Sequence, residues 1–154
     1  MAILDILTSP NPLLKQKSVP VARISQQTHR LIKDLFDTMK AYKGIGLAAP
    51  QVGILERVIV VGYKKRKMAL INPVIVGKTG EQTSDEGCLS LPGITVSVSR
   101  AKQIAVQALL PDETQVTLEE SGMIATIIQH EIDHLEGVLI TQYGPPILRQ
   151  EEEE

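Results

Sequence analysis

The sequence is poor in cysteine and in aromatic residues, and it contains no long apolar run. Its 154 residues include one Cys, no Trp, one Phe and three Tyr. A lone cysteine cannot form an intramolecular disulfide, which suits a reducing compartment. No apolar run approaches the roughly 20 residues of a membrane span, and the N-terminus lacks the basic start of a secretory signal. We therefore expect a cytoplasmic protein with a core of Ile, Val, Leu and Met.

The net charge of the chain is also small. It is −2 at pH 7, which gives no overall attraction to nucleic acid or to an anionic membrane. The basic run Lys64-Lys65-Arg66-Lys67 falls between two apolar segments and is interpreted as a solvated hairpin tip. RNA contact is the alternative, but no aromatic residue is interleaved and no second basic patch supports it. We expect no membrane partner and no direct nucleic-acid binding.

Two amphipathic helices are predicted, one near each end of the chain. Ser25 is a plausible N-cap for the first helix, which ends at Gly44. Ser121 is a plausible N-cap for the second helix, which runs to about Glu136 and is followed by Gly137. Apolar residues recur at helical spacing in both segments. The N-terminal helix is therefore expected to bury one face, and the C-terminal helix another.

Short strands are predicted between the two helices, and the segment 81–92 is expected to be turn-like. The strand segments are 57–63, 68–71, 73–76, 95–99, 103–110 and 115–118. Helices and strands do not alternate as βαβ units, so the pattern favours an α+β fold with mainly antiparallel strands packed around the C-terminal helix. The chain 1–154 is expected to be one domain, with a short disordered tail from about 145 that ends in four repelling glutamates.

The C-terminal helix contains the motif His130-Glu131-Ile132-Asp133-His134, which has the form H-E-x-x-H. A spacing of four puts both imidazoles on one helical face, close enough to share a metal ion. Glu131 lies at the edge of that face, where it can accept a proton from water on the metal. A catalytic centre of the zinc type has three protein ligands and one open position. A third ligand is therefore needed, and its identity decides the class of enzyme.

Elimination leaves Cys88 as the third ligand. The metzincin pattern needs a histidine where this chain has Ile140, and a thermolysin-like site needs a glutamate from a downstream helix. Glu136 is too near on the same helix, and the terminal glutamates are frayed. A thiolate is a strong ligand for zinc or ferrous iron. A buried, inert thiol is the alternative for Cys88, but the incomplete two-histidine site favours a ligand.

Three stretches together resemble the peptide deformylase family, which is marked by G-φ-G-φ-A-A-x-Q, E-G-C-φ-S and H-E-φ-D-H. Gly44–Gln51, Glu86–Ser90 and His130–His134 match these motifs in order at every fixed position. The resemblance implies a metal-dependent hydrolase that removes the N-formyl group, as formate, from the N-terminal formyl-methionine of newly made polypeptides. It implies one divalent ion, natively Fe²⁺, in a site that Zn²⁺, Ni²⁺ or Co²⁺ can also occupy.

The resemblance also implies roles for individual residues. The implied metal ligands are Cys88, His130 and His134, with Glu131 as general acid and base. Gln51 and the backbone N–H of Leu89 would form the oxyanion hole. The implied substrate-binding residues are Ile45, Gly46 and Gly87 through their backbone, Arg100 through its side chain, and Met123, Thr126 and Ile127 as the methionine pocket.

Two questions stay open. Many bacterial members of the family carry a long basic C-terminal helix implicated in ribosome docking, whereas this chain has Gly144-Pro145-Pro146 and an acidic tail, which argue against such a helix. A transient ribosome contact through Lys64–Lys67 is only a hypothesis. The function also has two alternatives: an endopeptidase of the general H-E-x-x-H kind, or a non-enzymatic domain with a structural metal, which would need a fourth protein ligand.

Overall fold

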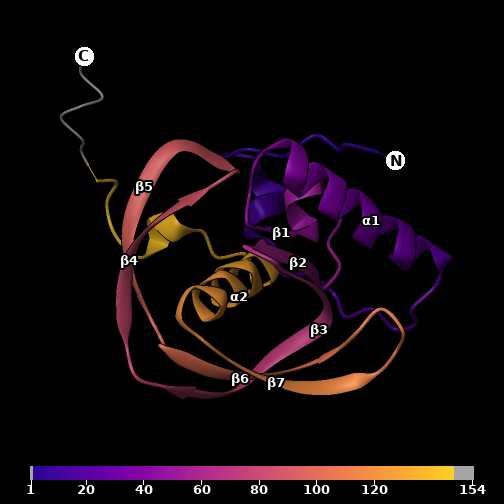
Figure 1. Ribbon diagram of the computed structural model, residues 1–154. Coiled ribbons are helices and arrows are strands. Elements are labelled where there is room, and N and C mark those ends of the chain that lie inside the picture. Colours follow the sequence, from indigo (N-terminus) through magenta and orange to yellow (C-terminus); the bar gives the residue numbers. More distant parts are fainter. Residues whose placement is uncertain (1, 148–154) are drawn as a thin grey trace.

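The computed structural model describes residues 2–147, which form two sheets, two α-helices and short 3-10 turns (Figure 1). Helix α1 spans Gln26–Ala41, and α2 spans Gly122–Leu135. Ser25 caps α1 in a reciprocal hydrogen-bonded box with Thr28, as its sequence position predicts. The strands are β1 Gly46–Ala48, β2 Val58–Tyr63, β3 Arg66–Thr79, β4 Gln82–Cys88, β5 Leu91–Arg100, β6 Gln103–Leu109 and β7 Gln115–Ser121. The 3-10 turns are η1 Pro12–Lys15, η2 Ala49–Val52 and η3 Ile140–Gln142.

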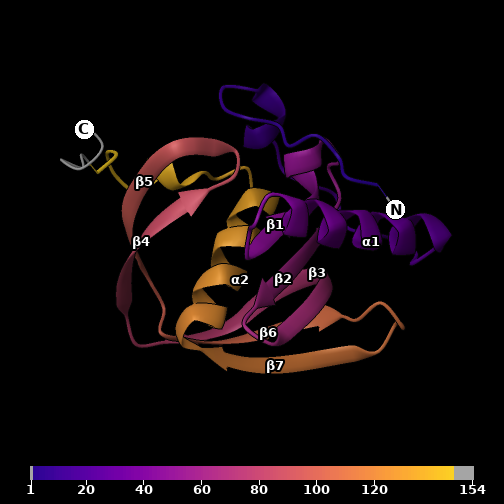
Figure 2. The ribbon, with the colours of Figure 1, turned by 45° about the horizontal axis from the view of Figure 1, so that its top comes forward.

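The larger sheet has five antiparallel strands in the order β1-β2-β3-β6-β7 and is covered on both faces near β2 (Figure 2). Residues of β2 alternate between the two helices. Ile59 and Val61 pack into the cluster that contains α2, whereas Val58 and Val60 pack into the cluster that contains α1. Burial on both faces explains why this strand is a continuous apolar run in the sequence.

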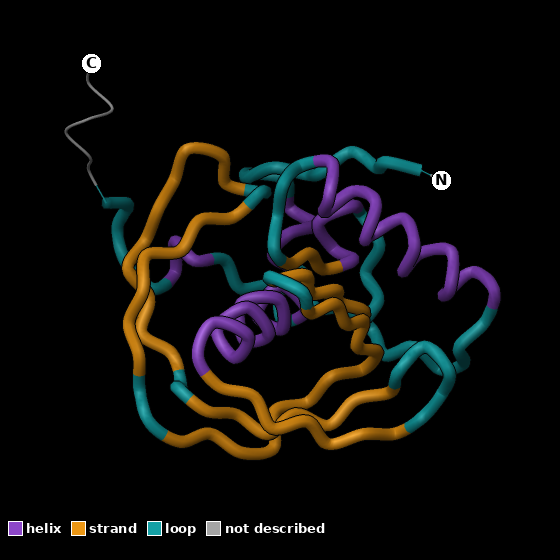
Figure 3. Tube along the Cα trace, viewed as in Figure 1, coloured by secondary structure: helices purple, strands orange, loops and turns teal. Residues whose placement is uncertain are grey.

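Strands β4 and β5 form a separate two-stranded sheet on the other side of α2. Figure 3 shows the strands running around α2, which lies inside them. A third apolar cluster beneath β5 includes Leu91, Val96 and Val98, together with Leu14 from the N-terminal segment and Leu139 after α2. Helix α2 is thus enclosed between the two sheets. This position explains why ten of its 14 residues are buried, His130, Glu131 and His134 among them.

The N-terminal arm, residues 2–11, is tied to the middle of the chain. The Leu7 N–H donates to the Gln51 carbonyl at 2.7 Å, and the Ser9 N–H donates to the Ser90 carbonyl at 2.9 Å. Backbone hydrogen bonds therefore fix this arm against two of the three sequence motifs.

The α+β class and the antiparallel pairing agree with the prediction, but two local predictions were wrong. The segments 68–71 and 73–76 belong to one strand, β3, whose irregular pairing between Ile71 and Val74 includes Asn72 at a φ of +54°. The segment 81–92 contains β4 rather than only turns. The short strand β1, which pairs with β2, lies outside the strand segments predicted from the sequence. In β4 the inward residues are polar, so alternation of polar and apolar residues could not reveal the strand.

The basic run forms a hairpin tip, as predicted, because Tyr63 pairs with Arg66 across a two-residue turn. Most of the tail predicted to be disordered, residues 148–154, lies outside the described residues. The Ile147 N–H donates to the Thr95 carbonyl at 2.7 Å, so the chain is held against β5 up to that point. None of the helices within residues 2–147 has the length and apolar character required to cross a lipid bilayer.

Candidate active site

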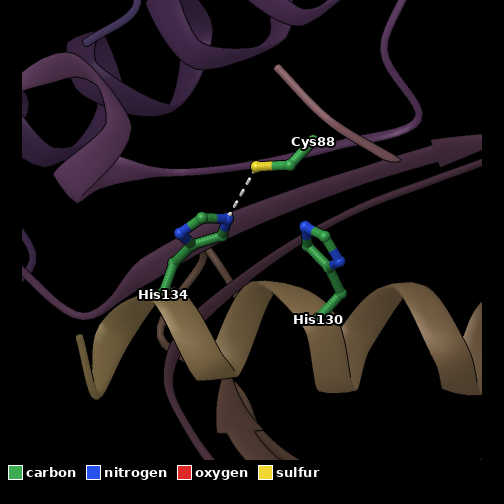
Figure 4. Close-up of side chains that lie close together, drawn as sticks. All are labelled: Cys88, His130 and His134. Atoms are coloured by element: carbon green, nitrogen blue, oxygen red, sulfur yellow. Dashed lines mark hydrogen bonds between the residues drawn. The ribbon is translucent and has the colours of Figure 1, made fainter. Parts of the chain in front are cut away.

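Cys88, His130 and His134 come together in three dimensions (Figure 4). Each offers one ligand atom, and these atoms lie within 4.8 Å of one another. Cys88 is at the end of β4, while both histidines project from α2, one turn apart. Cys88 Sγ lies 3.3 Å from His134 Nε2, and the two imidazole centroids are 5.1 Å apart. The strand and the helix thus present three metal-ligating side chains to one point.

The geometry of this cluster fits a single metal ion. Tetrahedral ligands at zinc-like bond lengths would be separated by roughly 3.5 Å, which is close to the distance between Cys88 Sγ and His134 Nε2. His134 is 2% exposed, and its Nδ1 has no hydrogen-bond partner within the described residues. One thiol and two imidazoles suit zinc or ferrous iron. No fourth protein ligand joins the cluster in residues 2–147, as an open catalytic site requires.

A chain of charged groups holds His130 from behind. His130 Nδ1 lies 2.9 Å from Glu86 Oε1, and Arg100 donates to both Glu86 oxygens at 2.6 and 2.8 Å. Arg100 also donates to Asp133 Oδ2 at 2.9 Å, which accepts a further bond from the Tyr143 hydroxyl at 2.6 Å. The proton on Nδ1 points to Glu86, so Nε2 of His130 is left to face Cys88. This series of contacts fixes both the tautomer and the orientation of the first histidine.

The charges in this chain are mutually compensated. Burial acts to raise the pKa of Glu86, but its bonds from His130 and Arg100 outweigh burial and hold that pKa below its usual value. Glu86 is therefore a carboxylate. A buried ion pair of this kind is costly unless its geometry and hydrogen bonds are good, and here each Glu86 oxygen accepts at least one bond.

Glu131 lies beside the cluster with one oxygen unpaired. The residue is 4% exposed, and its Oε1 has no hydrogen-bond partner among the described residues. Burial is the main cause that raises the pKa of Glu131, to about 7. A Cβ atom on Gly46 would lie 2.6 Å from Glu131 Oε2, so only glycine lets β1 pass this close to the carboxylate. The result is a proton acceptor poised near neutral pH next to the potential metal site.

Gln51 is oriented by its own helical turn. The Ala48 N–H donates to Gln51 Oε1 at 3.0 Å, which identifies that atom as the oxygen and turns the amide nitrogen inward. Gln51 Nε2 then lies 3.1 Å from Ser90 Oγ and 3.7 Å from Cys88 Sγ. The first sequence motif thereby supplies a fixed N–H donor at the cluster.

A cavity of about 650 Å³ opens in front of these groups. Its walls include most of the predicted substrate-binding residues, from β1, β4 and α2. These are Ile45, Gly46, Gly87, Met123, Thr126 and Ile127, together with Gln51, Cys88, Leu89, His130 and Glu131. Arg100 does not line this cavity. It is 7% exposed and bonded to Glu86 and Asp133, so the structure does not bring its side chain to the place predicted for substrate.

Other residues of the site were not singled out from the sequence. Glu86 belongs to a matched motif, but only its contact with His130 reveals what it does. Ser90 also belongs to a matched motif, and only its contact with Gln51 reveals its place in the site. Ile6 and Thr8 of the N-terminal arm also line the cavity, and nothing in their local sequence signals this. Their positions depend on the backbone bonds of the arm to Gln51 and Ser90.

Comparison with known proteins gives this geometry its context. The sequence model of the family described as polypeptide deformylase matches residues 3–150. The chain belongs to the peptide deformylase family. A peptide deformylase from Desulfitobacterium hafniense is 45% identical over 139 residues, which cover 90% of this chain and 93% of the relative.

Solved deformylase structures share the fold. The deformylase of Thermotoga maritima superposes with a TM-score of 0.91 at 36% identity, covering 95% of this chain and all of that one. A deformylase from Acinetobacter baumannii, solved with Met-Ala-Ser bound, gives a TM-score of 0.89 at 30% identity, covering 93% and 99%. The family, the fold class and the hydrolytic function predicted from three motifs are thus confirmed. The chain is a metal-dependent deformylase, and its family acts on formyl-methionine at the start of nascent peptides.

Proposed function

We propose that this deformylase works through one divalent ion held by Cys88, His130 and His134, with Glu131 as the general acid and base. The observation that carries the proposal is the unpaired, buried Glu131 carboxylate beside a cluster of three metal-ligating atoms within 4.8 Å. When bound, the ion supplies Lewis acidity that lowers the pKa of water toward about 7. The chain itself must then move the proton and hold the substrate.

Glu131 performs the proton transfers in this proposal. It accepts a proton from the water that attacks the formyl carbon, and it returns that proton to the amine as the C–N bond breaks and formate leaves. Burial raises the pKa of Glu131 to about 7, which suits both steps near neutral pH. Gln51 Nε2 and the Leu89 N–H donate to the oxygen that gains negative charge. Such a donor typically contributes about 10²–10³ in turnover.

The peptide is proposed to bind in extended form between β1 and β4. Backbone groups at Ile45, Gly46 and Gly87 line the cavity and suit pairing with an added strand. Met123, Thr126 and Ile127 then surround the methionine side chain. Arg100 is proposed to act on His130 through Glu86 rather than on the substrate, because its nitrogens are already bonded inside the protein.

The native ion, the cellular partner and the location are also proposals. A set of one thiolate and two imidazoles is compatible with Fe²⁺, and Zn²⁺, Ni²⁺ or Co²⁺ can replace it. The protein is proposed to meet nascent chains in the cytoplasm. A transient ribosome contact would rest on the Lys64–Lys67 tip, where Arg66 is paired with Glu120 at 2.7 Å and is therefore less available than the three lysines.

A formate-release assay tests the proposed activity. Protein loaded anaerobically with Fe²⁺ should release formate from formyl-Met-Ala-Ser and leave casein intact. Turnover of casein without deformylation would favour an endopeptidase instead. A fully metal-loaded, folded preparation that leaves the formyl peptide unchanged would refute the proposal.

Replacing Glu131 by Gln tests the acid–base role. We expect Glu131→Gln to keep the bound metal but to lose about 10²–10⁴ in kcat, the usual contribution of a general acid–base group. Metal content and formate release are measured on the same sample. Glu119→Gln, at an exposed position on β7, is the matched control and should retain wild-type turnover. Retained activity in Glu131→Gln would show that the role is misassigned.

A further inference from the structure

Polar residues in a repeating register form a polar wall along β4, and two of them, Ser84 and Glu86, line the substrate cavity. Gln82, Ser84 and Glu86 alternate along β4, so their side chains leave the same face of the strand. Two residues of a strand advance by about 6.6 Å, and four residues of a helix by about 6 Å. This match lets every second residue of β4 meet every fourth residue of α2, so the polar wall can follow the helix.

Hydrogen bonds confirm that register at both ends of the wall. Gln82 Nε2 donates to Thr126 Oγ1 at 2.8 Å and to the Gly122 carbonyl at 2.9 Å. Four residues further along β4, Glu86 meets His130 at 2.9 Å. Ser84 lies between these two fixed points. Strand alternation therefore directs its side chain toward α2, near Thr126, where both residues line the cavity.

The Ser84 hydroxyl has no hydrogen-bond partner among the described residues, unlike the side chains of Gln82 and Glu86. Ser84 is half-buried, and its side chain makes no hydrogen bond to any of residues 2–147. A hydroxyl covered by an apolar ligand without a partner costs free energy. The thioether of methionine is only a weak acceptor. Binding methionine would therefore remove water from Ser84 and give it little in return.

Oxidation of methionine changes this balance. Methionine sulfoxide has nearly the same length and branching as methionine, but it carries a polar oxygen on sulfur. That oxygen can accept a bond from a hydroxyl on the wall. It is also the chemical form into which an N-terminal methionine is converted by common oxidants, so a deformylase meets it without any change in the encoded peptide.

We propose that this cavity also accepts peptides that begin with N-formyl-methionine sulfoxide, with the Ser84 hydroxyl donating to the sulfoxide oxygen. The inference rests on the proposed function. The reaction is the same hydrolysis: water adds to the formyl carbon, the C–N bond breaks, formate leaves, and the sulfoxide passes through unchanged. The Gln82–Thr126 contact keeps the wall in place by linking β4 to α2.

The test compares kcat/KM for formyl-Met(O)-Ala-Ser with kcat/KM for formyl-Met-Ala-Ser, using each sulfoxide epimer separately. An apolar pocket rejects an added polar atom by about 100-fold. For the epimer that the wild type accepts better, we expect kcat/KM to be no more than about 10-fold below that of formyl-Met-Ala-Ser. One hydrogen bond to the sulfoxide oxygen recovers about 10-fold of the loss. Ser84 and Thr126 lie on one side of the cavity, so the two epimers should differ.

Variants connect the effect to the polar wall. Ser84→Ala should lower the sulfoxide-to-thioether ratio by about 10-fold, whereas Ser84→Thr, which keeps a hydroxyl, should restore it. Thr83→Val removes a hydroxyl from the opposite, exposed face of β4, where Thr83 contacts Ser99, and should leave the ratio unchanged. Thr126→Val gives a second measurement on the same wall if Ser84 variants fold poorly, and it too should lower the ratio.

The possible results separate this inference from the activity on which it rests. An absence of turnover with formyl-Met-Ala-Ser would overturn the proposed function itself. Normal turnover of that peptide, with a ratio that is the same in wild type, Ser84→Ala and Thr126→Val, would overturn only the role of the polar wall. A ratio that falls in Thr83→Val as much as in Ser84→Ala would overturn it as well.

Discussion

His130 and His134 share one helix, one motif and one proposed metal ion, yet the protein supports them in different ways. His130 hydrogen-bonds to Glu86 at 2.9 Å, and the bonding continues to Arg100, Asp133 and Tyr143. His134 is 2% exposed, and among the described residues Cys88 is the only hydrogen-bond partner of its ring nitrogens. The first imidazole is oriented by charge and hydrogen bonds, and the second by packing.

Because of this difference, the pKa values of the two rings shift in opposite directions when no metal is bound. Burial would lower the pKa of His130, but hydrogen bonds to Cys88 and Glu86 raise it to about 10. Burial, followed by the charge on His130, lowers the pKa of His134 well below its usual value. His130 and His134 are therefore not interchangeable, although they are the same residue type in one motif. Substitutions of the residues that support His130 should therefore act through electrostatics.

The largest effect is expected from Arg100→Met. This change leaves the Glu86 carboxylate buried without its cation, since the two side chains are 6% and 4% exposed. Removing one partner of a buried ion pair typically costs about 3–5 kcal/mol. Urea denaturation measures the loss in the free energy of unfolding. Arg66→Met is the matched control, because its pair with Glu120 involves an arginine side chain that is 53% exposed and should cost under about 1 kcal/mol.

Equal losses in the two arginine variants would contradict the asymmetry between a buried support and a surface pair. A large loss of unfolding free energy in Arg100→Met with unchanged metal affinity would show that Arg100 stabilises the fold but does not orient His130 for the metal. Both outcomes are measurable on the same two proteins.

Glu86→Gln should have a smaller, more local effect. The amide keeps the shape and can still accept one bond, but it no longer carries the charge that fixes His130. Substitution of such a supporting group typically costs about 10–100-fold in metal affinity. Competition with a chelator measures this affinity, and circular dichroism establishes that the variant is folded. Glu81→Gln, exposed just before the same strand, is the control. An affinity equal to wild type in Glu86→Gln would mean that packing alone orients His130.

The smallest effect is a change in bound protons. Nitrogen-15 NMR of the metal-free protein at pH 8 should show His130 as an imidazolium and His134 as a neutral ring, and zinc should remove the proton from His130.

The raised pKa of His130 stabilises the metal-free fold fully below about pH 6.5, and this contribution is lost as pH rises toward 10. The lowered pKa of His134 acts in the opposite sense, stabilising above about pH 6.5 and losing effect as pH falls. If the two rings titrate at the same pH, the proposed difference between the pKa values of His130 and His134 is wrong.

Sequence reasoning found the parts of the site that are local in the chain. The spacing of His130 and His134, the position of Glu131 and the need for a thiol ligand follow from one helix and one elimination. Strand β4 escaped because its inward residues serve the site, and their polar side chains hide the alternation that marks a strand. Arg100 was named from the resemblance, but its contacts with Glu86 and Asp133 could not be predicted, for another reason. Its contact with Asp133 spans 33 residues and exists only because β5 lies beside α2.

The N-terminal arm has a consequence for how this enzyme can be handled. Leu7 and Ser9 are bonded to the backbone of Gln51 and Ser90, and Ile6 and Thr8 form part of the cavity rim. Residues 6–9 thus border the place proposed for the beginning of the substrate. A deletion of this segment would remove the backbone bonds that support Gln51, the proposed oxyanion donor. A change at the other end of the described chain, near the contact of Ile147 with β5, leaves those bonds in place.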